Sequence, residues 1–254
     1  MPPESSLQLS EHARTPKQGH PDFITARSLL GLTSGMAILD SLIGGLKPDT
    51  IALITGSIRL QAAERYCVSV QLPPARGGLD GSTFFIDGGN SFDIYLFTEL
   101  VRKHQLAYQR ALERQQLSRA FTIYELRSLI QNPHSLLLDD KPKLIVISDI
   151  FALFNEDVPK TEARQVVGEI TSSIAGLSER ENVPIVITSA DRPEFLTPIL
   201  EGECKISADI TEDGGRTTAR LFKHPWKNPV EISEETGPSN YNQDTLDMEP
   251  KLHG

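Results

Sequence analysis

The sequence predicts an α/β protein with a mostly parallel central sheet, helices on both sides and a C-terminal antiparallel hairpin. Two observations lead to this fold class. Short apolar runs recur without polar alternation, which is typical of strands buried on both faces, at residues 51–55, 83–86, 144–147 and 184–188. The intervals between them are long enough for crossover helices. Alternating strands and helices favour a parallel sheet covered on both sides.

The N-terminal segment, residues 1–21, is polar and rich in proline, so we expect a disordered tail. A core domain is expected over 22–232. Near its start, Thr33 or Ser34 is predicted to cap a short helix, and Gly44 with Gly45 to end it. The apolar face of this helix would be Met36, Leu39, Leu42 and Ile43.

Residues 50–72 form the stretch around which the chain is organised. They read as a short apolar strand ending at Gly56, a turn, and a helix over 59–72 with an apolar stripe. In nucleotide-binding sheets this turn is a glycine-rich loop with a lysine, wrapped around phosphate. Here the turn has one glycine and no lysine, and the helix starts without Ser or Thr. The sequence therefore predicts the architecture of a phosphate loop without its chemistry.

Further helices are expected over 93–116, 122–137 and 162–182. The C-terminal part changes character, because residues 205–211 and 216–223 flank an Asp-Gly-Gly turn and indicate a hairpin. Residues 230–232 would add a last strand. The acidic segment 233–254 is expected to be a disordered tail.

Composition limits the classes of function. The net charge of -9 argues against strong chain-wide attraction to nucleic acid or to an anionic membrane, but it leaves a local basic patch open. Cys67 and Cys204 are too few for a disulfide framework, so we expect buried, reduced thiols in a cytoplasmic protein. No apolar run approaches membrane-spanning length.

The order of these pieces resembles the core domain of the RecA/RadA recombinase family. Residues 33–46 are similar to the family segment that precedes its phosphate loop, with Leu-Asp and a Gly pair in place. The strands at 83–87, 144–149 and 184–188 have counterparts in the same order. The resemblance covers roughly 23–232 and lacks the helical lead-in domain of archaeal recombinases. It implies a core-only, archaeal-type paralogue with a RecA-like, P-loop NTPase-type fold.

Departures from the family pattern concern the nucleotide site. Laid on the family's phosphate loop, Gly56 matches the first glycine, while Gln61, Ala62 and Ala63 stand at the second glycine, the lysine and the threonine. The lysine supplies a cation to the β- and γ-phosphates, and the hydroxyl holds magnesium. Alanine does neither, and Arg59 adds a side chain where backbone amides would approach phosphate.

The Walker B region departs as well. Gly89 falls where the family has the glutamate that polarises the attacking water, and Ser148 falls where the magnesium-associated aspartate sits. Asp149 is displaced by one residue, which turns a strand side chain to the opposite face. The resemblance therefore implies a pseudo-ATPase with degenerate Walker A and Walker B motifs. We expect no cofactor and no metal.

Two readings of the remaining charges stay open. Arg59 and Arg65 could rebuild an anion site at the helix N-terminus, although solvated helix charges are more common and are favoured here. Asp149 could serve a ligand, although a cap for the following turn is favoured.

Family recombinases polymerise through a Phe-x-x-Ala tetrad that docks into a neighbouring subunit. Phe23 and Ala26 form such a tetrad before the core and could dock into a partner. The alternative, which we favour, is a buried staple of an entry helix, because short motifs have high false-positive rates.

Candidate DNA contacts come from two loops and from a basic and aromatic cluster. The loops that grip DNA in the family would be 151–160 and 190–205, and neither is basic or rich in glycine. The candidate contacts are Arg192, Lys205, Lys223, Trp226 and Lys227. Trp226 could stack on a base, but a tryptophan packed at a sheet edge is the favoured reading.

The leading hypothesis is a non-hydrolysing accessory factor in homologous recombination and DNA repair. It would act through protein contacts with a recombinase or another RecA-like paralogue, as a homo- or hetero-oligomer, in the manner of Shu-type mediators. One alternative is a DNA-binding RecA-like module. Another is a nucleotide-sensing RecA-like ATPase of the circadian-clock or signalling type.

Overall fold

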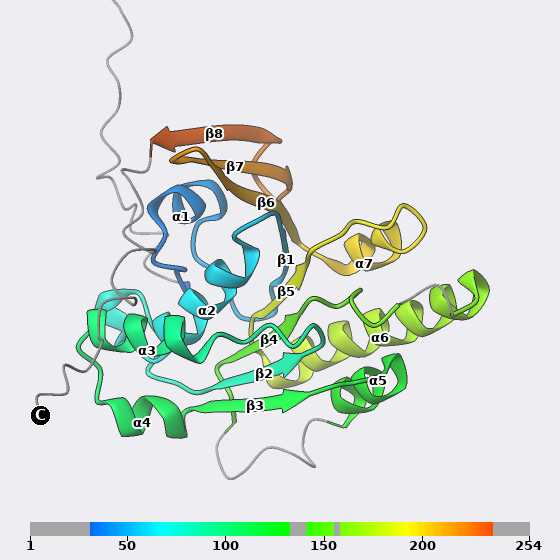
Figure 1. Cartoon of the computed structure of the whole chain (residues 1–254), viewed down its shortest axis with the longest axis horizontal. Helices are drawn as coiled ribbons and strands as arrows, with labels where there is room; N and C mark the ends of the chain where they lie inside the picture. Colours follow the sequence, from blue (N-terminus) through cyan, green and yellow to red (C-terminus); the bar gives the residue numbers. More distant parts are fainter. Residues whose placement is uncertain (1–30, 133–140, 155–157, 236–254) are drawn as a thin grey trace, which may run out of the picture.

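A computed structural model describes residues 31–132, 141–154 and 158–235 (Figure 1). An eight-stranded sheet has the order β3-β2-β4-β5-β1-β6-β7-β8. Strands β3 to β6 in that order pair in parallel, and β6, β7 and β8 pair antiparallel. The strands are β1 (Ile51–Thr55), β2 (Thr83–Asp87), β3 (Gln115–Arg119), β4 (Leu144–Ser148), β5 (Ile185–Ser189), β6 (Ile206–Asp213), β7 (Arg216–Lys223) and β8 (Val230–Glu235). The predicted fold class is confirmed.

Helices cover both faces of the sheet (Figure 1). They are α1 (Ala37–Ile43), α2 (Arg59–Ser69), α3 (Ile94–Lys103), α4 (Tyr108–Glu113), α5 (Ile123–Gln131), α6 (Lys160–Glu181) and α7 (Thr197–Glu203), with a 3-10 turn η2 (Pro74–Arg76). Successive side chains of β1 point to opposite faces. Ala52 and Ile54 join the core under α1 to α4, and Ile51 and Leu53 join the core under α5 to α7. Every residue of β1 is therefore buried, as the continuous apolar run predicted.

The single helix expected over 93–116 is wrong. Helix α3 ends at Lys103, Gln105 adopts a left-handed φ of 55°, and α4 follows. The chain then enters β3, an edge strand that, among the described residues, pairs only with β2. Because β3 is half exposed and polar, it lacks the apolar run by which the other parallel strands were found. Helix α7 was also missed, in a segment expected to be a loop.

The predicted cap of the first helix is wrong as well. Helix α1 begins at Ala37, and the residue before it makes no side-chain cap. Instead, the Asp40 carboxylate accepts hydrogen bonds from the Ser34 hydroxyl at 2.8 Å and from the backbone N–H groups of Ser34 and Gly35 at 2.7 and 3.0 Å. The predicted end is confirmed, since Gly44 has a φ of 80° and its N–H donates to the Asp40 carbonyl.

The C-terminal hairpin and last strand are confirmed, with Gly214 and Gly215 at positive φ in the turn. Strand β8 continues to Glu235, so the expected tail cannot begin at residue 233. The rest of both expected tails lies outside the described residues. Cys67 and Cys204 are buried free thiols, as expected. Among the helices of the described ranges, none combines the length and apolar character needed to cross a membrane.

Candidate functional site

The turn after β1 lies tightly against β6. Gly56 has a φ of 100°, and a Cβ at this position would lie 2.1 Å from the carbonyl oxygen of Ile210. The Ile58 N–H donates to that same carbonyl at 3.3 Å, and the Glu212 N–H donates to the Ser57 hydroxyl at 3.0 Å. Only glycine fits where the backbones approach so closely. Helix α2 begins directly afterwards, at Arg59.

Arg59 turns its guanidinium onto Asp149, at the end of β4. Nε donates to Oδ1 at 2.7 Å and Nη2 donates to Oδ2 at 3.0 Å, while Nη1 donates to the Gly56 carbonyl at 3.2 Å. The two side chains are only 15% and 8% exposed. The favoured readings are therefore wrong for Arg59, which is not a solvated charge, and for Asp149, whose carboxylate does not cap a turn. The planar fork of arginine matches a carboxylate in this bidentate way.

The backbone around Asp149 holds this ion pair in place. Asp149 has a φ of 45°, and its N–H donates to the Thr188 hydroxyl at 3.0 Å. Gly89 lies directly beside it, since a Cβ at Gly89 would come within 2.7 Å of the Asp149 Cβ. The structure thus brings together four of the predicted positions, Gly56, Arg59, Gly89 and Asp149.

Ala62 and Ala63 lie in the core rather than at the surface. Both are fully buried within the cluster under α1 to α4, whereas Gln61 is exposed. The Ala62 N–H donates to the Ile58 carbonyl at 3.1 Å, so this amide belongs to the first turn of the helix. Neither methyl group can supply a charge or a metal ligand.

Ser148 belongs to a second polar cluster, around Asp87. Its hydroxyl hydrogen-bonds to Asp87 Oδ1 at 3.0 Å and to the Ser91 hydroxyl at 2.9 Å, and Arg119 pairs with Asp87 at 3.2 Å. Burial opposes ionisation of Asp87, but hydrogen bonds from Ser91, Ser148 and Phe92 outweigh it and lower its pKa. Sequence reasoning did not assign Asp87 to the site, although its place at the end of a buried strand was a usable signal.

Glu64 is a buried acid that the sequence analysis missed. One carboxylate oxygen accepts the Asp93 N–H at 2.6 Å, and the other is buried without a hydrogen-bond partner. Burial, followed by the neighbouring charges of Asp93 and Asp87, raises the pKa of Glu64 to about 8. The helical spacing does place Glu64 beside the apolar stripe of α2, but periodicity alone does not separate a buried glutamate from one at the boundary.

Replacing Glu64 with glutamine is expected to stabilise the fold at alkaline pH. Because the folded pKa of about 8 exceeds the ordinary value of 4.5, the folded state binds the extra proton. The stability that Glu64 contributes is complete below pH 4.5 and falls as the pH rises to about 8. At pH 9 we expect Glu64→Gln to gain about 2 kcal/mol in unfolding free energy. Urea unfolding at several pH values measures this, with exposed Glu113→Gln as control; equal gains at pH 4 and pH 9 would contradict it.

The cations proposed for DNA contact are engaged within the protein. Arg192 pairs with Glu201 and Lys205 with Asp49, while Lys223 donates to the Glu201 carbonyl at 2.7 Å. Lys227 donates to carbonyls at the end of α1, which a cation there stabilises.

Trp226 does not pack at the sheet edge as favoured. Its side chain is 71% exposed, with Lys47 Nζ 4.6 Å from the ring centroid and His224 against its edge. Its ring is therefore accessible.

Two other predictions concern docking and metals. Phe23 and Ala26 lie outside the described residues. Within the described part of the chain, no group of three or more His, Cys, Asp or Glu side chains could hold a metal ion.

Comparison with known proteins agrees with the resemblance. The Rad51 family model matches residues 25–194. This chain belongs to the Rad51 family. It is 25% identical over 63% of its length to a DNA repair protein RAD51 homolog of Solanum lycopersicum, and 24% identical over 65% to the DNA repair and recombination protein RadA of Aeropyrum pernix. A DNA repair protein RAD51 homolog 1 of Arabidopsis thaliana is 25% identical over 64%.

The Rad51-family chain spans about half the length of these relatives, with 49%, 54% and 50% of each covered. The matched region contains strands β1 to β5, the turn at Gly56 and the Arg59–Asp149 pair. The family match therefore covers Gly56, Arg59, Gly89 and Asp149 of the candidate site.

Proposed function

We propose that this Rad51-family chain is a non-hydrolysing paralogue that serves homologous recombination and DNA repair through protein contacts. The observation that carries the proposal is the bidentate Arg59–Asp149 ion pair at the turn after β1. The names of its relatives, DNA repair and recombination proteins, support the process in which it acts.

The ion pair makes the turn a poor site for a nucleotide. Arg59 is largely buried and already holds a carboxylate and the Gly56 carbonyl, so a phosphate would have to displace Asp149. A free Asp149 carboxylate beside phosphate would then repel it. The buried methyl group of Ala62 offers no cation in compensation. Gly89 likewise has no side chain that could polarise an attacking water or hold a metal.

Calorimetric titration with Mg-ATP and a phosphate-release assay test the proposal. We expect no binding heat and no phosphate release by the wild-type chain, with a recombinase that has an intact phosphate loop as positive control. Arg59→Ala should also show no binding heat and no phosphate release, because the loop still lacks a lysine and a hydroxyl. Turnover of ATP by the wild-type chain would favour the nucleotide-sensing alternative and reject the proposal.

A pull-down with the host's recombinase tests the accessory role. If the tetrad docks, Phe23→Ala should reduce recovery of the recombinase, whereas Phe222→Ala on β7 serves as a matched control. Failure to recover a recombinase or any paralogue would count against a role through protein contacts, even if the ATP experiments are silent.

A second candidate function, direct DNA binding, is favoured by the accessible ring of Trp226. Aromatic stacking of bases contributes roughly 1–3 kcal/mol per base. A gel-shift titration at two salt concentrations should show weaker binding at the higher one, because phosphate contacts release counterions. Trp226→Ala should weaken it further, while Tyr95→Ala, another exposed aromatic, should not. Absence of a shift at low salt would reject this function.

A further inference from the structure

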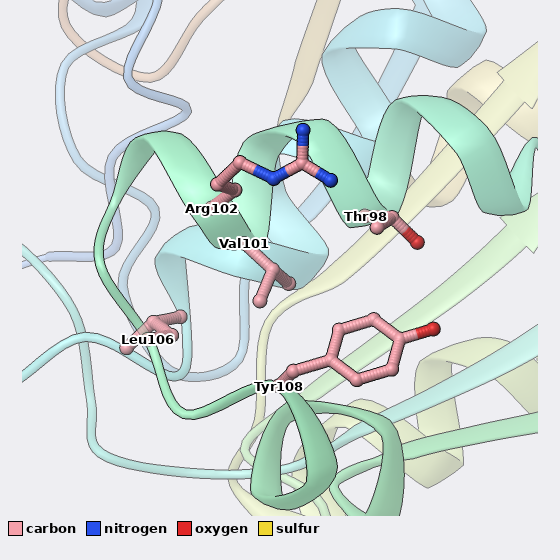
Figure 2. A pocket seen from close by; sticks show the side chains of 5 residues that line it. All are labelled: Thr98, Val101, Arg102, Leu106 and Tyr108. Atoms are coloured by element: carbon pink, nitrogen blue, oxygen red, sulfur yellow. The ribbon is translucent and has the colours of Figure 1, made fainter.

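A concave site unconnected with the phosphate-loop turn lies between α3 and α4. We call it the α3–α4 cleft; its volume is about 450 Å³, and Figure 2 shows the side chains that line it. They are Thr98, Val101, Arg102, Leu106 and Tyr108. Thr98 and Val101 extend from α3 toward the side on which the Tyr108 ring lies (Figure 2). The cleft is large enough for one or two side chains of a ligand.

The cleft has an apolar floor and a polar rim. Val101 is 1% exposed and closes the cleft from beneath, while the partly buried Leu106 presents accessible aliphatic surface. Tyr108, the first residue of α4, is 51% exposed and offers a ring face together with a hydroxyl. Exposed tyrosines of this kind are enriched at binding surfaces, because the ring packs while the hydroxyl remains hydrated.

One cation, Arg102, lines the cleft, and further cations lie beside it around His104. Arg102 and Lys103 end α3, and the adjoining His104 receives a hydrogen bond on its carbonyl from Arg76 at 3.2 Å. Burial, followed by the charges of Arg76, Lys103 and Arg65, lowers the pKa of His104, which means that these cations lie around it.

The helix dipole alone does not account for this patch. Cations in the last turn of α3 complement the dipole, but Arg65 belongs to α2 and Arg76 to η2. In the ranges that the structure describes, no carboxylate lies within ion-pair distance of Arg65, Arg102 or Lys103. On a chain with a net charge of -9, these four residues form a local group of cations, with Glu99 one turn earlier on α3.

We propose that the α3–α4 cleft binds an acidic segment of a partner protein, which inserts one aromatic or aliphatic side chain against Leu106 and Tyr108. Arg102 and Lys103 would pair with carboxylates that flank the inserted side chain. Charge complementarity at such a rim steers association and selects the partner. A concave apolar floor suits a side-chain anchor better than a nucleic-acid backbone, which needs cations along an extended track.

The inference goes beyond the proposed function and is separable from it. The cleft shares no residue with the turn at Gly56 or with the Arg59–Asp149 pair. The two proposals can therefore fail independently. The chain could bind ATP and still bind a partner through the cleft, or it could bind neither ATP nor a partner at the cleft.

The experiment pans a phage-displayed library of short random peptides against the full chain. We expect enrichment of peptides that carry an aromatic or large aliphatic residue flanked by Asp or Glu. Fluorescence anisotropy with an enriched peptide should show at least about tenfold weaker binding to Arg102→Glu and to Tyr108→Ser. The matched control is Arg164→Glu, which makes the same charge change at an exposed position on α6 and should leave affinity unchanged.

Specific outcomes would overturn the proposal. These are enrichment without acidic residues, equal loss in Arg164→Glu and Arg102→Glu, or no enrichment at all. Tight binding of labelled oligo-dT that disappears in Arg102→Glu, with no peptide enriched, would assign the surface to nucleic acid instead. Circular dichroism checks the fold of each variant, and Lys103→Glu replaces Arg102→Glu if the latter does not fold.

Discussion

Ala62→Lys is expected to destabilise the fold by about 4 kcal/mol or more, or to prevent folding. This change restores the lysine that a phosphate loop would carry. Ala62 is fully buried in the core under α1 to α4, where a lysine chain finds no space and its ammonium no solvent. Overpacking and the burial of an unpaired charge therefore add. Urea unfolding followed by circular dichroism measures the loss.

Gln61→Lys provides the matched control for this experiment. Gln61 is exposed on the same turn of α2, so a lysine there should change stability by less than about 0.5 kcal/mol. If Ala62→Lys folded with wild-type stability, or gained binding of Mg-ATP, then the position would be open to a phosphate. Either result would contradict the proposal that this turn cannot serve a nucleotide.

Arg59→Ala is expected to cost roughly 3 kcal/mol of unfolding free energy. The Asp149 carboxylate is 8% exposed in the wild type, and the variant removes the guanidinium that both of its oxygens accept from. Removing one partner of a buried ion pair leaves the other charge uncompensated, which is more costly than the pair's net contribution. Thermal and urea unfolding measure the effect.

The double variant Arg59→Ala with Asp149→Asn separates the cost of an unpaired Asp149 charge from the cost of truncating the Arg59 side chain. It should be more stable than Arg59→Ala alone, since the uncompensated charge is gone. Arg65→Ala, on the same helix and without an ion pair to any described residue, should stay within about 0.5 kcal/mol of wild type. A loss of equal size in Arg65→Ala and Arg59→Ala would show that the Asp149 contact is not responsible.

The parallel strands could be predicted because their burial leaves a direct mark. A strand covered on both faces is apolar over most of its length, as β1 and β5 are before their terminal Thr and Ser residues. Strand β3 lies at the sheet edge and carries glutamines and an arginine, so no pattern in its own residues distinguished it from the end of a helix. Its assignment depends on the pairing with β2.

The candidate site was predictable only as a list of positions. Alignment with the family motif identified Ala62 and Ala63 as departures, because the motif prescribes residue types at fixed spacing. The partner of Arg59 was not predictable, since Asp149 lies 90 positions away and meets it only when β1 and β4 enter one sheet. The buried position of Glu64 and the exposed position of Trp226 were not predictable either, because both depend on contacts between distant parts of the chain.

By itself, the sequence determined the fold class, the order of its main strands and the positions where a phosphate loop would differ. These follow from local patterns, because hydrophobic periodicity and motif spacing involve neighbours along the chain. Tertiary structure decided that Arg59 pairs with Asp149, that Ala62 is interior, and that a cleft lined by Arg102 and Tyr108 lies between α3 and α4. Such features depend on which distant side chains share a desolvated space, and that is set by packing rather than by spacing.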